Sequence, residues 1–530
     1  MQNKQMQHLM KGAVILSIAS FIAKVLSAVY RIPFQNMVGN TGFYVYQQVY
    51  PIYGIGMTFA LSGFPVYISK LVAEQVNPEE QTQLLRRSFA LLGIFGAAIF
   101  IYLQYQTPKI AGAMADPALT PLIEMVSFMF LLMPFLAVTR GHFQGIFNMV
   151  PTAVSQVAEQ LVRVVVILAA AWLSLKLHWS VYEMGTWAIS GAFFGGLVAT
   201  YILLRPAETA FQLKAPHRGG IDFKAYQQLA KRLAIEGGSI CLFASLIVLL
   251  QLVDSFTVKK GLVLSGLSEE LAKNMKGIFD RGQPLVQLGL VVSLAFSSTL
   301  IPSLSQARQR RQQYQFQQVA EALIHISLGL SAAATTGLMV LMPQINYFLF
   351  GDADGNQALV WYMLSIAIIA LINACNSVLQ SLDQFHKTTA ALIVGLIVKV
   401  AINQWLVQHY QIVGASVGTV ISLGVVLALI LRQSPVIVRQ ALGLQRFTGK
   451  LLAICAVMWL GVKIALQFAP QSLSSRGHAI LGTGLGVLVG VLLFGGLALR
   501  WQLFSIREWL TMPGGRQLLR LSKKIKGRTK

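Results

Sequence analysis

Basic side chains inside apolar segments are the residues of this sequence whose chemistry is most informative. Lys24 interrupts the first apolar run, and Arg31 follows directly after that run. The two cations are about two helical turns apart, so both should point the same way on one helix. A charge inside a lipid-spanning helix costs about 3 kcal/mol or more unless it faces a protein interior or a wet cavity. Two cations along one helix face therefore predict a site for an anionic cargo.

Three further charges lie in later apolar runs. Glu159 and Arg163 are spaced i,i+4, which allows an ion pair on one helix face. Such a pair could pack against a neighbouring helix or line a cavity that binds the cargo. Lys399 has Gly395 four residues before it and so no acidic partner there. Because an unpaired lysine in a membrane span is unfavourable, we expect Lys399 to face a wet cavity or an anion.

Other polar residues have plainer explanations. Glu236 begins an apolar run beside Lys231 and Arg232, with which it can pair. Asp280 and Arg281 are adjacent opposite charges at a predicted helix end, where such residues are usually solvated. The sequence has no phosphate-binding P-loop, no HExxH zinc motif and no nucleophile triad, which disfavours an ATP-driven pump or an enzyme.

Tyrosines gather at the ends of the first two predicted helices: Tyr30, Tyr44, Tyr46, Tyr50 and Tyr53. At such a position they could form an aromatic belt at the membrane interface or a surface on which sugar rings stack. The belt is the plainer interpretation.

The composition is that of a helical membrane protein with many spans. Of 530 residues, 55% are hydrophobic and 12% are charged, too few charges to cover a soluble protein of this size. Apolar runs of about 18–25 residues recur along the chain, each long enough to cross a bilayer. The three cysteines are scattered singly, without metal-ligand spacing, so we expect no metal site and no disulfide.

The apolar runs predict an all-α polytopic membrane protein with about fourteen transmembrane helices. When the loops are assigned alternately to the two sides, most of the 42 lysines and arginines fall on one side. The positive-inside rule then places both termini in the cytoplasm. Topology thus explains the net charge of +23, and we expect no nucleic-acid partner.

An internal repeat organises the chain. LVRVVVI at 161–167 resembles IVKVAIN at 397–403, which places Arg163 and Lys399 at equivalent positions. Repeated bundles with a site at their interface are a transporter architecture. We predict two six-helix lobes, two extra C-terminal helices and a basic cytoplasmic tail on anionic lipid, at residues 1–215, 216–435, 436–500 and 501–530.

The segment FIAKVLSAVYRIPFQNMVGNTGFYVYQQVYPIY at 21–53 resembles the opening of the SpoVB/MurJ-like polysaccharide exporters. That family belongs to the MOP exporter superfamily, which also holds the Wzx flippases and the MATE drug exporters. The residues that carry the resemblance are Lys24, Val25, Leu26, Tyr30, Arg31, Gly39, Gly42, Tyr46, Gln47 and Pro51. DRG at 280–282 and LIPSLSQ at 300–306 are similar to the eighth helix of lipid II flippases.

The resemblance implies two lobes around a cationic cavity and a groove for a lipid tail between the extra helices. It implies that Lys24, Arg31 and Arg281 contact the diphosphate of an undecaprenyl-linked saccharide. Two departures stand out. Lys24 stands where arginine is usual, which removes a bidentate phosphate contact. GIGM at 54–57 lacks a basic residue that some lipid II flippases carry.

These features predict a flippase of the bacterial cytoplasmic membrane that works by alternating access, with lipid II for peptidoglycan synthesis as its first candidate substrate. Three alternatives stay open: a flippase for teichoic-acid or capsular precursors, a cation-coupled MATE-type drug exporter, and a non-transporting morphogenesis scaffold. The expected partners are the lipid-linked saccharide, membrane lipids and cell-wall synthesis proteins.

Energy for such transport would come from the membrane potential alone or from coupling to Na⁺ or H⁺, and we expect no other cofactor. Some relatives bind sodium in the second lobe. By that resemblance, Glu236 with Asn373 is the candidate ion site here.

Overall fold

The computed structural model describes residues 2–75, 77–211, 222–382, 384–434, 436–441, 447–468, 475–512 and 517. Within these ranges the regular secondary structure is entirely helical, which confirms the predicted all-α class. The helices are α1 (Gln2–Val29), α2 (Arg31–Thr58), α3 (Phe64–Glu74), α4 (Pro78–Ala113), α5 (Thr120–Ser127), α6 (Met129–Gly145), α7 (Met149–Leu177), α8 (Val181–Phe211), α9 (Phe223–Arg232), α10 (Gly238–Ala244), α11 (Leu246–Leu264), α12 (Glu269–Asp280), α13 (Gly282–Gln309), α14 (Gln313–Val340), α15 (Met342–Phe350), α16 (Asn356–Ser381), α17 (Phe385–Gln433), α18 (Val436–Ala441), α19 (Gly449–Gln467), α20 (Arg476–Arg500) and α21 (Ile506–Thr511).

Ten helical segments of the described residues are long and apolar enough to cross a membrane, and a helix pair bent by 71° brings the number to eleven. Two of the ten, Ile15–Glu74 and His386–Gln433, have 60 and 48 residues, about twice the length that one crossing needs. Each contains a residue with non-helical backbone, Gly39 (φ 71°) and Gln411 (φ 50°). Counted as two passes each, and with α13 included, these segments are consistent with the fourteen predicted spans.

The chain divides into two compact units. Unit 1 consists of Met1–Asp280 with Leu396–Ala415, and unit 2 of Arg281–Gly395 with Ser416–Lys530. This division groups α9 to α12 and part of α17 with the N-terminal helices, whereas the predicted first lobe ends at residue 215. The four predicted parts of the chain stay a prediction.

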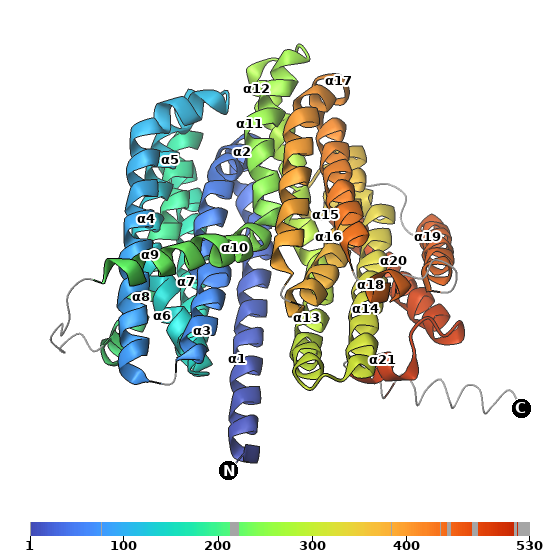
Figure 1. The fold of residues 1–530 in the computed structure, drawn as a ribbon. Coiled ribbons are helices and arrows are strands. Elements are labelled where there is room, and N and C mark those ends of the chain that lie inside the picture. The colour runs from blue at the N-terminus through green and yellow to red at the C-terminus, as the bar shows by residue number, and fades with distance from the viewer. Residues whose placement is uncertain are drawn as a thin grey trace, which may run out of the picture. The chain divides into compact units, whose positions relative to one another are not determined.

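The helix α2 lies at the centre of unit 1. Its second half is buried almost continuously and packs against α5, α7, α8, α11 and α12. The contact with α12 is especially close, since a Cβ on Gly277 would lie 2.1 Å from the carbonyl oxygen of Asn40. The short helix α9 lies across this bundle and carries basic residues in its last turn (Figure 1). Unit 1 therefore fixes the positions of the buried side chains in the second half of α2.

The helix α14 lies at the centre of unit 2, against α13, α16 and α19. The C-terminal α21 begins with a capping box formed by Ser505 and Glu508. Glu508 also lies 2.8 Å from Nδ1 of His325 on α14, and Gly329 leaves room for the ring of Phe504. These contacts anchor the end of the described chain, while most of the basic tail predicted to lie on lipid is outside the described residues.

Candidate anion-binding site

Arg31 begins α2 and is completely buried. Its guanidinium lies 4.3 Å from the ring centroid of Tyr50 and 6.0 Å from that of Tyr30. None of its three side-chain nitrogens has a hydrogen-bond partner, and within the described ranges no carboxylate reaches ion-pairing distance. A buried charge without hydrogen-bond partners costs several kcal/mol, so Arg31 occupies an unfavourable environment in this structure.

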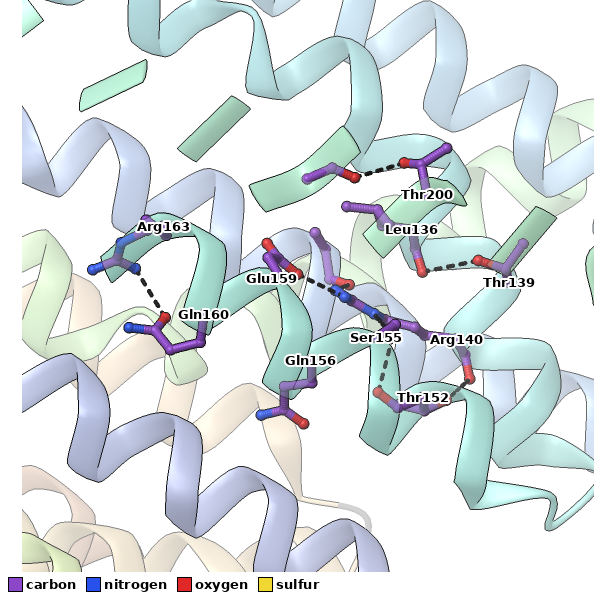
Figure 2. A network of polar contacts seen from close by, with 12 residues as sticks. Leu136, Thr139, Arg140, Thr152, Ser155, Gln156, Glu159, Gln160, Arg163 and Thr200 are labelled. Carbon is purple, nitrogen blue, oxygen red and sulfur yellow. Dashed lines mark hydrogen bonds and ion pairs between the residues drawn. The ribbon is translucent and has the colours of Figure 1, made fainter. Parts of the chain in front are cut away.

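Arg163 on α7 lies at the same tyrosines. Its Nη1 donates hydrogen bonds to the Tyr53 hydroxyl and to Oε1 of Gln160 (3.2 Å), and its Nη2 donates to the Tyr30 hydroxyl at 3.0 Å. Its guanidinium lies 5.3 Å from the Tyr30 ring centroid and 5.8 Å from that of Tyr50. Because both guanidinium groups lie near the rings of Tyr30 and Tyr50, the two positive charges are close together. Figure 2 shows Arg163 with its Gln160 contact.

We call Arg31, Arg163, Tyr30, Tyr50 and Tyr53 the arginine–tyrosine cluster. All five side chains are at most 7% exposed. Tyr44 and Tyr46 are buried as well, so the interpretation of the five N-terminal tyrosines as an interfacial belt is wrong. The physical reason is that the second half of α2 lies in the interior of unit 1, so its tyrosines meet protein and not the lipid headgroups.

The other cations buried in the interior of unit 1 are neutralised by carboxylates. These pairs are Arg140 with Glu159 at 2.6 Å, Lys276 with Asp280 at 2.5 Å, Lys399 with Asp254 at 2.7 Å, and Lys259 with Asp116 and Glu269 at 3.9 and 3.3 Å. In the arginine–tyrosine cluster the described residues provide only neutral partners. Neither arginine of the cluster therefore has an ion-pair partner among the described residues.

The predicted pair of Glu159 with Arg163 is wrong. Glu159 accepts a hydrogen bond from Nη2 of Arg140 at 2.6 Å, and Nε of Arg140 donates to the Ser155 hydroxyl at 3.2 Å (Figure 2). Arg140 comes from α6, which lies against α7, and it meets Glu159 from the side away from the cluster. The i,i+4 spacing allows a pair with Arg163, but the Glu159 carboxylate binds Arg140 instead. The position of Arg140 relative to Glu159 is set by the tertiary fold.

The expectation that Lys399 lacks an acidic partner is also wrong. Its Nζ donates to Oδ2 of Asp254 at 2.7 Å, from α17 to α11. Nδ2 of Asn403 donates to Oδ1 of the same carboxylate at 3.0 Å and to the Thr257 hydroxyl at 2.7 Å. Sequence reasoning missed Asp254, although an aspartate that ends an apolar run is itself a signal of a buried partner.

The other predicted cations lie in different surroundings. Lys24 on α1 has an accessible side chain and forms no ion pair within the described ranges, whereas Arg31 is completely buried. In unit 2, Arg281 is buried and its Nη1 and Nη2 donate to the two oxygens of Asp352 at 2.5 and 2.8 Å. Nη1 of Arg281 also donates to Oδ1 of Asn346 at 3.1 Å. The charge of Arg281 is therefore compensated inside its own unit.

Glu236 forms exposed ion pairs with Lys70 at 3.7 Å and with Arg232 at 3.9 Å. This confirms the plainer interpretation of Glu236 as a paired residue at the start of a span. Asn373 lies half-buried on α16 in the other unit. Their role as an ion site stays a prediction.

The fold is that of a known class of transporter. The solved structure of the lipid II flippase MurJ in an inward closed conformation matches with a TM-score of 0.66 at 12% identity, over 92% of this chain and 99% of that one. An inward-facing multidrug-resistance MATE family transporter of the MOP superfamily matches with a TM-score of 0.63 at 15% identity, over 82% and 99%. The protein thus has the fold of a multi-pass transporter of the MOP superfamily.

The family model of the polysaccharide biosynthesis proteins matches residues 9–308, and the chain belongs to this family. It is 34% identical over 518 residues to the uncharacterized membrane protein YabM of Bacillus subtilis (strain 168), covering 96% of this chain and 95% of that protein. It is 27% identical over 483 residues to the lipid II flippase MurJ of the same organism, covering 86% and 88%. These findings confirm the family resemblance and place the chain among membrane transport proteins and not among enzymes.

Proposed function

We propose that this protein flips a polyprenyl-diphosphate-linked saccharide across the bacterial cytoplasmic membrane, with lipid II as the first candidate. The observation that carries the proposal is the arginine–tyrosine cluster, with two buried guanidinium groups that form no ion pair with any described carboxylate. A diphosphate esterified at both ends carries about two negative charges, which match the two arginines. Guanidinium groups bind phosphate oxygens in a bidentate geometry, and tyrosine hydroxyls add donors.

The sequence relatives support the same substrate class. One relative is named for flipping lipid II, and the family is named for polysaccharide biosynthesis. Undecaprenyl-linked teichoic-acid and capsular precursors share the diphosphate and differ in the saccharide. The arginine–tyrosine cluster recognises the shared part, so these precursors belong in the same test as lipid II.

The MATE-like fold raises drug export as a second function. Cationic drugs need a site with a net negative charge, whereas the cluster carries two arginines without an acidic partner in the described part of the chain. Like charges repel strongly where burial weakens the screening by water. The charge of the cluster therefore favours an anionic cargo over a cationic one.

Transport would proceed by alternating access. Both arginines are buried here, so helices around the cluster must separate to admit a diphosphate. An inside-negative membrane potential favours outward movement of the anion. For two charges that cross the whole field, about 100 mV supplies at most about 4–5 kcal/mol.

The test uses vesicles that contain the purified protein and a fluorescent lipid II, with flipping measured as exposure of the label to an external quencher. Arg31→Gln and Arg163→Gln should each slow flipping at least tenfold, because each removes charged hydrogen bonds worth about 1.5–3 kcal/mol. Arg310→Gln, which changes an exposed arginine, is the matched control and should leave the rate unchanged.

A stability measurement separates a lost site from a lost fold. Removal of a buried charge that lacks partners should leave the protein as stable as before or more stable. Slow flipping by a stable Arg31→Gln variant would therefore report on binding. If the wild-type protein flips neither lipid II nor the teichoic-acid and capsular precursors, the proposed function is refuted.

A further inference from the structure

A strip of polar side chains runs along α7 from the arginine–tyrosine cluster. Gln156 and Gln160 precede Arg163 by seven and three residues, so the three side chains lie on one face of the helix. All three are buried. Figure 2 shows Gln156 and Gln160 on the side of α7 that faces away from Arg140. A group attached to an anion at Arg163 would therefore meet these two amides next.

Gln160 has one donor without a partner. Its Oε1 accepts a hydrogen bond from Nη1 of Arg163 at 3.2 Å, and a guanidinium group can only donate, so the orientation of the amide is fixed. Its Nε2 is buried and has no hydrogen-bond partner within the described ranges. An unpaired buried donor is unfavourable, and a ligand oxygen beside it would remove that cost. Gln160 is therefore suited to an acceptor that lies next to the anion.

The helix α1 covers this strip. It packs along α7, and the Ser20 hydroxyl donates to Oε1 of Gln156 at 3.2 Å. The buried residues in the second half of α1 are alanines, whose side chains offer no acceptor. Movement of α1 away from α7 would break the Ser20 contact and uncover both amides.

The position of Gln160 selects the part of the cargo that it can reach, because it lies about 4.5 Å from Arg163 along the helix axis. In a diphosphate-linked sugar the phosphate is bonded to C1 of the ring, so the substituent on C2 is the nearest one to it. An acetamido group on C2 presents a carbonyl oxygen that only accepts. A hydroxyl group there also needs an acceptor for its own proton, and Oε1 of Gln160 already accepts from Arg163. The acetamido carbonyl is therefore the better partner for Nε2.

We propose that Gln160 is a specificity-determining residue, whose Nε2 donates a hydrogen bond to the acetamido carbonyl of the sugar attached directly to the diphosphate. The protein then prefers carriers whose first sugar is a 2-acetamido sugar over carriers whose first sugar has a hydroxyl group on C2. This inference rests on the proposed function, because it takes Arg163 to bind the diphosphate of the cargo. A neutral hydrogen bond to an otherwise unpaired buried donor is worth about tenfold in affinity.

The probes are farnesyl-diphospho-N-acetylglucosamine and farnesyl-diphospho-glucose. They share the lipid, the diphosphate and its charge, and they differ only in the substituent on C2 of the sugar. Titration calorimetry of the purified protein in detergent gives the affinity for each probe. The wild-type protein should bind the acetamido probe about tenfold more tightly than the glucose probe.

The variant that tests the assignment is Gln160→Met, which keeps the length of the side chain and removes the donor. It should bind the two probes with about equal affinity. The lost contact with Arg163 acts on the diphosphate, which both probes share, so its effect cancels in the ratio of the two affinities. Gln160→Asn, whose amide is one carbon shorter, is a second variant with the same expected result. The matched control is Gln83→Met, which changes an exposed glutamine of α4 and should keep the wild-type ratio.

Each contrary result has a distinct meaning. Equal affinity of the wild type for the two probes would overturn the specificity and leave the proposed function standing, because the diphosphate would still be bound. A tenfold preference that survives in folded Gln160→Met or Gln160→Asn protein would overturn the assignment to Gln160. If the wild type binds neither probe and flips no diphosphate lipid, the proposed function fails, and the specificity fails with it.

Discussion

Replacement of Lys399 by methionine should destabilise the protein by about 3–5 kcal/mol, because it removes one partner of a buried ion pair. Lys399 and Asp254 are 0% and 1% exposed and lie 2.7 Å apart. In the variant the Asp254 carboxylate stays buried, with a hydrogen bond from the neutral Asn403. That single bond cannot offset the desolvation of a full charge.

The double variant Asp254→Asn with Lys399→Met removes both charges and should cost only about 0–2 kcal/mol, since a neutral replacement of a buried pair is often tolerated. Equilibrium unfolding in mixed detergent micelles measures both free energies. Equal destabilisation by the single and double variants would contradict the reasoning, because it would mean that the isolated Asp254 charge is solvated. The flipping rate of the stable double variant would also test whether Lys399 contacts the cargo, as the sequence suggests. Slower flipping would support that contact, whereas flipping at the wild-type rate would mean that Lys399 only holds α17 to α11.

Two further predictions concern packing and pH. Gly277→Ala should destabilise the protein by about 1–3 kcal/mol in thermal unfolding, because the added Cβ would meet the Asn40 carbonyl oxygen. The control is Gly93→Ala, which has open space around it and should be neutral or slightly stabilising. Burial raises the pKa of Asp352, but the hydrogen bonds and charge of Arg281 outweigh this and hold it below its usual value. The stability from this pair is therefore present above about pH 4 and lost as the pH falls further. Arg281→Gln should reduce that acid dependence of thermal unfolding and leave the part due to the backbone N–H of Asp354; an unchanged dependence would contradict the assignment.

Much of the fold could be predicted because the relevant signals are local. An apolar run of sufficient length becomes a membrane helix wherever it lies in the chain, so composition alone indicated the all-α class. The breaks at Gly39 and Gln411 divide two long helices near the loops that the runs implied. The presence of Arg31 and Arg163 in the cluster was also indicated, because cations in apolar runs are rare without a function.

The partners of the buried charges could not be predicted in the same way. Arg140 lies 19 positions from Glu159, Asp254 lies 145 from Lys399, and Asp352 lies 71 from Arg281. Helical periodicity relates residues within a few turns and carries no information about which helices become neighbours. The same limit applies to the tyrosines. The sequence gives their positions along the predicted helices but does not show whether they are buried.

The sequence by itself determined that the chain crosses a membrane many times and that it carries cations where lipid would not tolerate them. The tertiary structure decided which of these cations remain without an acid. Arg140, Lys276 and Lys399 are each neutralised by a carboxylate, whereas the partners of Arg31 and Arg163 in the described part of the chain are tyrosines and an amide. The physical reason is that the electrostatic energy of a buried charge depends on distances between helices, and packing alone sets those distances.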